Sequence, residues 1–172
     1  MSGVTVRPVR REDLPLLYVD HDEDPVGTFG YTATNALERN FDADGLIGYD
    51  HGTLVIQDAD GAVAGKVAWR PVPHGHNIAS HALNIGTRLR PAFRGRGLGT
   101  VGKILVAAYL FETTTFERLQ AETDVTNVAA QRSLEKAGFT REGIARHAQY
   151  RKGAYHDMVV YSRLRNDPAP HR

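Results

Sequence analysis

The stretch Arg94–Gly99, which reads Arg-Gly-Arg-Gly-Leu-Gly, decides the fold of this 172-residue chain. It follows a strand-like run and precedes the clearest helical pattern in the sequence, which begins at Leu98. Glycines let a ligand approach the main chain closely, and the N–H groups at a helix start attract anions. The two arginines add charged donors. The stretch therefore predicts a phosphate-binding turn at a helix N-terminus.

Two other phosphate motifs nearly match the same segment. Residues 97–102 fit G-x-G-x-x-G, and Asp124 supplies a later acid, but a dinucleotide fold needs several strand-helix-strand units and only one is present. Residues 97–103 fit G-x-x-x-x-G-K, yet Ile104 stands where a magnesium-binding hydroxyl is required. A nucleotide triphosphatase is therefore not expected, and an NAD(P)-binding oxidoreductase remains only as an alternative.

Hydrophobic periodicity predicts the elements on both sides of the turn. Upstream we expect strands at 4–9, 53–57, 62–69 and 82–89, helices at 14–19 and 32–41, and a loop that contains Pro71 and Pro73. Downstream we expect a helix at 98–112, a strand at 119–125 parallel to the one at 82–89, a helix from Thr126 or Asn127 to Ala137, and a hairpin of 143–150 with 155–164. This order predicts an α/β sheet of mixed direction.

Composition narrows the class of protein. The formal charge of +1 gives no reason to expect nucleic-acid binding, and the absence of cysteine excludes thiolate chemistry. No apolar stretch is long enough for a membrane helix, so we expect a cytoplasmic protein without a membrane partner. Residues 166–172 carry two prolines and are expected to be a disordered tail behind a single domain at 1–165. No metal is expected, although His74, His76 and His81 are of ligand type.

Two motifs in the chain resemble those of the GNAT superfamily of acetyltransferases. Residues 94–99 are similar to its R/Q-x-x-G-x-G/A signature, and residues 127–139, Asn-Val-Ala-Ala-Gln-Arg-Ser-Leu-Glu-Lys-Ala-Gly-Phe, look like its second motif. Residues 138–143 and 154–161 are similar to the RimJ/RimL-like branch. Over residues 4–165 the resemblance implies a mixed, mostly antiparallel central sheet of about seven strands flanked by about four helices.

The resemblance also implies a binding site for acetyl-CoA. The backbone of the turn would hold the pyrophosphate, a strand backbone would stabilise the oxyanion, Asn127 would bind pantetheine, and two cations on its helix could reach the adenosine phosphates. The residues implied for this donor site are Ile85, Gly86, Thr87, Leu89, Arg90, Arg94, Gly95, Arg96, Gly97, Leu98, Gly99, Thr100, Asn127, Arg132 and Lys136. For Asn127, a plain helix N-cap explains the residue equally well.

The reaction implied is direct attack of a primary amine on the thioester. Most of an amine with a pKa near 10 is protonated at neutral pH, so a base or a water relay must take a proton from it. Glu122, five residues before Asn127, is the candidate base, although it also fits the polar face of its strand. The tyrosine that many relatives use as an acid is replaced by Leu134, and a frequent serine by Ala130. Ser133 is a nearby hydroxyl and the candidate proton donor, although a helix serine also bonds its own backbone and solvent is the alternative donor.

The acceptor implied is a small amine-bearing metabolite or antibiotic, or a protein N-terminus. Its site would be built from residues 20–24, 69–81 and 147–156, which are rich in acids, histidines and aromatics. A CoA-binding regulatory module without catalysis is the alternative from another class. The edge of the closing hairpin is a possible surface for a homodimer.

Overall fold

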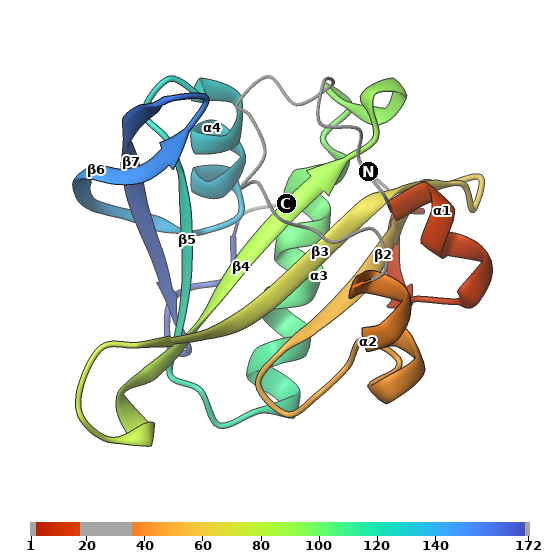
Figure 1. Cartoon of the computed structure of the whole chain (residues 1–172), viewed down its shortest axis with the longest axis horizontal. Helices are drawn as coiled ribbons and strands as arrows, with labels where there is room; N and C mark the ends of the chain where they lie inside the picture. The colour runs from red at the N-terminus through yellow and green to blue at the C-terminus, as the bar shows by residue number, and fades with distance from the viewer. Residues whose placement is uncertain (1–2, 18–35, 171–172) are drawn as a thin grey trace.

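The computed structural model describes residues 3–17 and 36–170, and a seven-stranded sheet forms its centre (Figure 1). The strand order is β1-β2-β3-β4-β5-β7-β6. Every neighbouring pair is antiparallel except β4 and β5, which are parallel, so the predicted mixed, mostly antiparallel sheet is confirmed. The strands are β1 (Thr5–Pro8), β2 (Gly52–Gln57), β3 (Val63–Pro73), β4 (His81–Leu89), β5 (Arg118–Asp124), β6 (Thr140–Arg151) and β7 (Ala154–Leu164).

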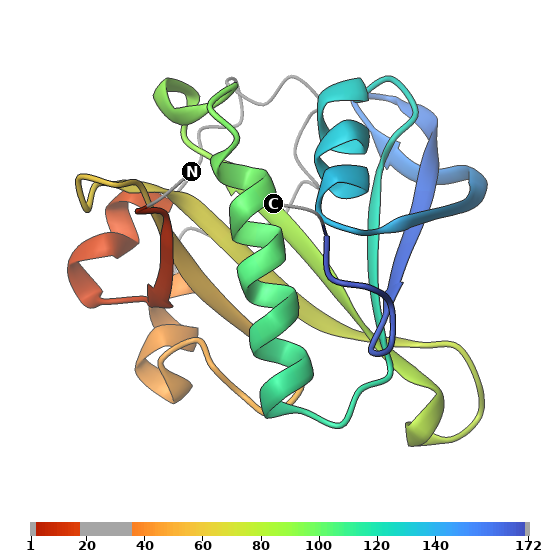
Figure 2. The ribbon, with the colours of Figure 1, turned by 180° about the vertical axis from the view of Figure 1, so that it is seen from behind.

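Four α-helices accompany the sheet in the described residues. They are α1 (Leu14–Leu17), α2 (Ala36–Asp44), α3 (Leu98–Thr113) and α4 (Val128–Lys136). The view from behind shows α3 crossing one face of the sheet, with α4 beside it over the strands of the C-terminal half (Figure 2). Parts of the first two predicted helices, 18–19 and 32–35, lie outside the described residues, as does the predicted acceptor loop at 20–24.

The expected loop around Pro71 and Pro73 is wrong, because both prolines belong to strand β3. They pair with Leu83 and His81 of β4. The other neighbour of β3, strand β2, pairs with it only as far as Trp69, so the prolines lie where β3 has an open edge. A proline is tolerated there because that edge requires no N–H donor.

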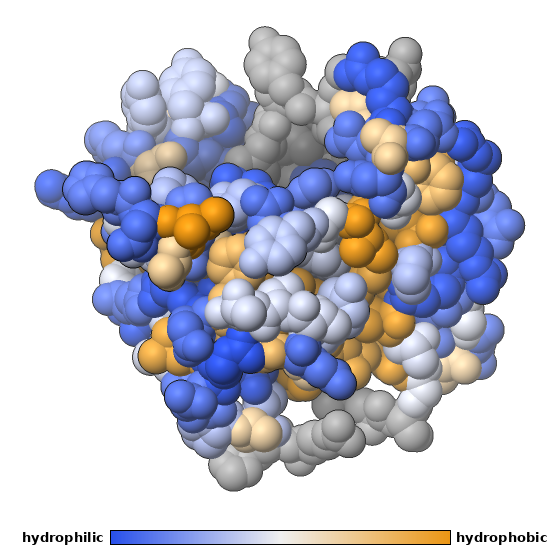
Figure 3. All heavy atoms as spheres, turned by 90° about the horizontal axis from the view of Figure 1, so that it is seen from below, coloured by the Kyte–Doolittle hydropathy of each residue, from blue (hydrophilic) through white to orange (hydrophobic). Residues whose placement is uncertain are grey.

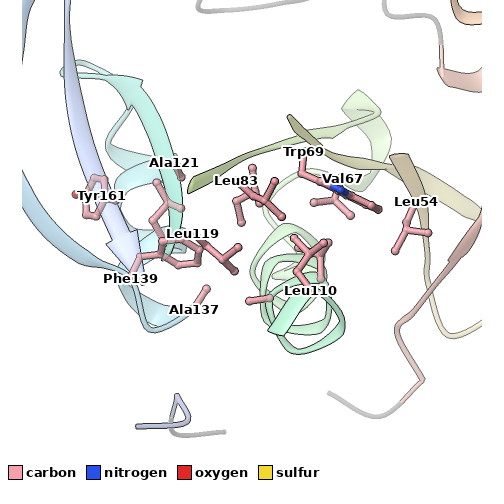
Figure 4. Packing of buried hydrophobic residues seen from close by; sticks show 14 of the residues in the cluster. Leu54, Val67, Trp69, Leu83, Leu110, Leu119, Ala121, Ala137, Phe139 and Tyr161 are labelled. Carbon is pink, nitrogen blue, oxygen red and sulfur yellow. The ribbon is translucent and has the colours of Figure 1, made fainter. Parts of the chain in front are cut away.

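The main core lies between α3, α4 and one face of the sheet (Figure 4). Leu110 of α3 packs near Leu83 and Val67, while Phe139 and Tyr161 lie on the β5–β7 side. Gly102 brings α3 close to the sheet, since a Cβ at this position would lie 2.5 Å from Cδ1 of Ile56. A smaller core on the opposite face joins α1 to the sheet; it consists of Val9, Leu14, Leu17, Leu46, Val55 and Val63.

Strands β4 and β5 diverge, and this divergence positions the site. Their register contains only two pairs, Leu83 with Leu119 and Asn84 with Gln120. Beyond these pairs the strands separate towards their C-terminal ends, which is visible as a V in the middle of the sheet (Figure 1). The turn at 94–99 follows one arm of the V, and helix α4 follows the other.

The exposed surface is of mixed character. Seen from below, hydrophobic residues form several separate groups among hydrophilic ones (Figure 3), as on most exposed protein surfaces. No helix within residues 3–17 and 36–170 has the length and apolar character needed to cross a membrane. At the C-terminal end, the N–H of Leu164 donates to Asp167, and Pro170 lies beside Gly138.

Candidate active site

A cleft of about 540 Å³ lies where β4 and β5 diverge. Residues from both faces of the sheet line it, because the space passes between the two strands. Its lining comprises Ala68, Trp69 and Arg70 of β3; Asn84, Ile85, Gly86, Thr87 and Arg88 of β4; Lys103 of α3; Ala121, Glu122, Thr123 and Asp124 of β5; Asn127, Ala130 and Leu134 in and beside α4; and Gln149 and Met158 of the closing hairpin.

The structure brings five of the sequence-predicted site residues to this cleft. They are Ile85, Gly86, Thr87, Glu122 and Asn127. The remaining predicted donor residues lie outside its lining, in the segment that continues from β4 into α3 or on the outer part of α4. Arg132 and Lys136 are exposed on α4, and Ser133 lies between α4 and α3.

The turn at 94–99 has the geometry of an anion-binding helix start. Gly95 and Gly97 adopt positive φ angles of 74° and 77°, which glycine tolerates and other residues rarely do. Gly97 caps α3, and its carbonyl accepts from the N–H groups of Thr100 and Val101. The preceding N–H groups have no acceptor within the helix and add to the positive end of its dipole.

The arginines around the turn already have protein partners. Arg90 donates to the carbonyl of Val63, and Arg94 donates to that of Leu89. Arg96 lies over the ring of Phe93 at 5.4 Å and 3.6 Å from Asp58. The arginine side chains around the turn are therefore engaged within the protein.

Asn127 has the capping geometry that its sequence position allows. Its Oδ1 accepts from the N–H of Ala130 at 3.1 Å, so it is the N-cap of α4. The cap uses only the side-chain oxygen, which leaves the NH₂ group as a donor at the wall of the cleft. The N-cap and ligand-binding interpretations are therefore compatible.

A hydrogen-bonded chain holds Glu122 on the wall formed by β5. Gln120 donates to Glu122 at 2.7 Å and accepts from Arg118 at 3.3 Å. Arg118 also makes a two-pronged ion pair with Glu142, and this hydrogen bonding lowers the pKa of Glu142 to about 2. Glu122 itself is exposed to solvent.

Asp124 forms a buried polar cluster at the end of β5 that the sequence analysis did not identify. Its carboxylate accepts from the N–H and hydroxyl of Thr126 and is ion-paired with Arg151, which also donates to Gln149. Burial alone would raise the pKa of Asp124, but the hydrogen bonds from Thr126 and Arg151 outweigh it and lower the pKa to about 2. Asp124 is therefore a fixed anion whose charge is compensated inside the protein.

Lys103 is a second residue that the sequence analysis did not assign to the site. It lines the cleft from the second turn of α3 and is only 8% exposed. Burial lowers the pKa of its ammonium to about 8. In the sequence, Lys103 stands out only as the lysine of the G-x-x-x-x-G-K string, which is typical of nucleotide triphosphatases.

Three buried polar atoms of the cleft residues have no hydrogen-bond partner. They are the indole Nε1 of Trp69, the hydroxyl of Thr87 and Nε2 of Gln149. Buried polar groups in proteins are almost always paired, and residues that line this cleft hold half of the six unpaired side-chain atoms found in the described residues. Among the residues the structure describes, no group of three or more His, Asp or Glu side chains is placed to hold a metal ion.

The mixed sheet, its V-shaped cleft and the glycine-rich helix start together define the fold of a CoA-dependent acyltransferase. The model of the family described as "Acetyltransferase (GNAT) domain" matches residues 4–140. The chain therefore belongs to the GNAT acetyltransferase family.

Two curated relatives come from Bacillus subtilis (strain 168). "Probable N-acetyltransferase YjcK" is 37% identical over 83 residues, which are 48% of this chain and 46% of that protein. "Putative ribosomal N-acetyltransferase YdaF" is 29% identical over 108 residues, 63% of this chain and 57% of that protein. The chain thus spans about half the length of the curated relatives that it matches.

Solved structures share the whole fold at low sequence identity. The spermidine N-acetyltransferase of Vibrio cholerae, crystallised with CoA and spermine, has a TM-score of 0.78 and 20% identity, with 97% of this chain and 98% of that chain covered. The spermidine/spermine N-acetyltransferase SpeG from Vibrio cholerae, in complex with manganese ions, has a TM-score of 0.73 at 20% identity, with 95% of this chain and 94% of that chain covered. This likeness establishes the fold along the full described chain.

Proposed function

We propose that this protein transfers an acetyl group from acetyl-CoA to a primary amine. The observation that carries the proposal is the cleft between β4 and β5, which is lined by residues with unpaired buried polar atoms and by Lys103, whose Nζ donates to Gly99 at the start of α3. Family membership and the CoA complex of a structural neighbour support the choice of donor.

The donor would lie along the V, with its phosphates at the turn and its thioester near the middle of β4. The exposed backbone of Gly86 offers close approach, because nothing lies within 4 Å of the position a Cβ would take. An N–H of the Ile85–Thr87 segment would donate to the oxyanion that forms on attack. Thr87 could give its unpaired hydroxyl to the pantetheine arm.

Glu122 would act as the base, directly or through a water molecule. It removes one proton from the acceptor ammonium, and the neutral nitrogen attacks the thioester carbon. The tetrahedral intermediate then loses a second proton from nitrogen to solvent, and the carbon–sulfur bond breaks to give the neutral amide and the thiolate of CoA. The structure supports this role because Glu122 lines the cleft and accepts from Gln120, which orients its carboxylate.

The proton donor for the thiolate is proposed to be solvent or Ser133. Leu134 and Ala130 line the cleft where a hydroxyl could have served. Ser133 lies behind them, hydrogen-bonded to Thr100 and Lys103. It would need a water molecule to reach the sulfur.

The acceptor is proposed to be either a small amine or a protein N-terminus. The spermidine N-acetyltransferase neighbour favours the first class, and the name of YdaF, which refers to ribosomal acetylation, favours the second. Incubation of the purified protein with acetyl-CoA and both acceptor classes, with thiol release as the readout, would separate them. Failure to release CoA with any amine would contradict the proposal.

A CoA-binding module without catalysis is the second candidate, and the apolar residues at positions 130 and 134 favour it. Such a module would bind acetyl-CoA, but Glu122→Gln would leave all of its measured properties unchanged. An enzyme would lose turnover and retain its donor affinity.

We further propose a cytoplasmic location, where a CoA thioester is accessible, and a homodimer through the sheet edge at β6. Strand β6 is the last strand of the sheet, so one of its edges has no neighbour in the strand order. The register of β6 with β7 is interrupted between Ala145 and Gln149. A second copy could therefore pair only with the regular stretches of β6 on either side of this interruption. Light scattering during size-exclusion chromatography would give the oligomeric state.

A further inference from the structure

Lys103 places a positive charge directly behind the glycine turn. Its Nζ donates to the hydroxyl of Ser133 at 3.0 Å and to the carbonyl of Gly99 at 3.4 Å. The Ser133 hydroxyl is also 2.9 Å from that of Thr100. Because helical side chains point back towards the N-terminus, the ammonium lies beside the first turn of α3.

The charge of Lys103 has no counter-ion within the described part of the chain. An ammonium has three N–H donors, and only two have partners. No carboxylate of the described residues is within ion-pair distance of Nζ, and both acids that line the cleft are engaged, Glu122 with Gln120 and Asp124 with Arg151. The other charged side chains in the cleft lining are the cations Arg70 and Arg88.

Burial of an uncompensated ammonium is costly, and a bound anion would remove the cost. Helix α4 contributes Ala130 and Leu134 to this part of the cleft, and neither offers a charge. Arg94 of the turn donates to the carbonyl of Leu89, and Arg96 lies against Phe93 and Asp58. Neither arginine therefore takes the place of an anion beside Lys103.

We propose that Lys103 is a donor-binding residue whose ammonium, held by Ser133, pairs with the phosphate groups of the acyl-CoA. The inference rests on the proposed function, since it assigns a residue to the donor site of that reaction. Its role is electrostatic: Lys103 provides the full charge, while the turn provides backbone N–H groups.

The first test is donor affinity, measured by isothermal titration calorimetry with acetyl-CoA and no acceptor. Lys103→Met keeps the length of the side chain and removes the charge, so we expect affinity to fall by about tenfold or more, the usual size of a charge-assisted hydrogen bond. Lys66→Met is the matched control, because Lys66 is another lysine whose pKa is lowered by burial but it does not line the cleft. Equal affinity of Lys103→Met and the unaltered protein would overturn the inference.

The second test needs no variant and uses proton uptake. The free protein has the Lys103 pKa at about 8, and a nearby phosphate would raise it. Acetyl-CoA binding at pH 8, measured in two buffers of different ionisation enthalpy, should therefore take up protons. Acetyl-CoA has no free thiol, so uptake reports on its phosphates and not on a thiolate. Lys66→Met should retain the uptake and a folded Lys103→Met should lose it, whereas no uptake by the unaltered protein would overturn the inference.

The two proposals fail in different ways. If the unaltered protein does not bind acetyl-CoA at all, the proposed function fails together with the inference. If it binds and turns over an amine while Lys103→Met binds equally well, only the role of Lys103 is wrong. A loss of turnover by Lys103→Met with unchanged donor affinity would also overturn phosphate binding, and would point to the leaving thiolate instead.

Discussion

The side-chain amide of Gln120 donates to the carboxylate of Glu122 at 2.7 Å, and both residues lie on the face of β5 that faces away from α3. The carboxylate is thereby held on the wall of the cleft without being neutralised by an ion pair. A proton acceptor needs this combination of fixed position and solvent access.

Glu122→Gln should lower kcat by about 10²- to 10⁴-fold with whichever amine proves to be the acceptor, the usual contribution of a general base. Donor affinity should remain unchanged, since the amide keeps the shape of the side chain. Steady-state kinetics combined with calorimetry would measure both. Glu117→Gln, a change of an exposed acid outside the cleft, is the control, and equal kcat values for the two variants would assign the base role to water.

Thr87→Val should stabilise the free protein while weakening donor binding. The hydroxyl of Thr87 is buried without a partner, so its removal relieves a penalty of about 1 kcal/mol. The variant then also lacks the hydroxyl that is proposed to contact the pantetheine arm of the donor. Thermal denaturation with and without acetyl-CoA would show a higher Tm without donor and a smaller shift with it. A lower Tm without donor would mean that the hydroxyl is satisfied in the free protein.

Asp124→Asn should lower the free energy of unfolding at pH 7 by about 3–5 kcal/mol, because it leaves Arg151 buried without its counter-ion. The folded-state pKa is lowered, so the ionised group stabilises the protein above the ordinary carboxyl pKa and this stabilisation disappears as pH falls towards about 2. Urea denaturation at a series of pH values should show that the difference in free energy of unfolding between the unaltered protein and Asp124→Asn becomes smaller as the solution is made more acidic. Asp42→Asn, at an exposed ion pair with Arg11, should cost less than about 1 kcal/mol.

Gly102→Ala should destabilise the protein by about 1–3 kcal/mol, although alanine is the better helix former. The new Cβ would lie 2.5 Å from Cδ1 of the buried Ile56. Ile56→Val deletes that atom, so the double variant should recover part of the loss in a double-mutant cycle. Gly99→Ala is the matched control in the same helix, because its Cβ would meet Leu89 only at 3.4 Å. Equal costs of the two alanine substitutions in chemical denaturation would contradict this account of the packing.

Much of the fold could be predicted because its signals are local. The helix from Leu98 has one apolar face and begins at glycines, and the strand at 118–124 alternates regularly, so both elements and their parallel pairing were predicted correctly. The path of β3 through Pro71 and Pro73 was missed because tolerance of a proline depends on which strand edge is open. That property belongs to the sheet and is absent from the local sequence.

The candidate site was only partly predictable, for a related reason. Residues within one motif, such as Asn127 and Gly97, are identifiable from local spacing. Lys103 and Asp124 acquire their character from partners that are 30 and 27 residues away, Ser133 and Arg151. A lysine in the apolar pattern of a helix gives no indication of how its charge is compensated until the neighbouring helix is placed.

The two register pairs that join β4 to β5 make the sheet a union of two antiparallel halves, each of which supplies one wall of the cleft. A molecule bound between the walls is therefore also a cross-link between the halves. Its binding energy adds to the cohesion of the chain, so occupancy and resistance to unfolding should rise together. Protection from proteolysis of the residues where β4 and β5 pair would measure ligand occupancy. This measurement requires no knowledge of the acceptor.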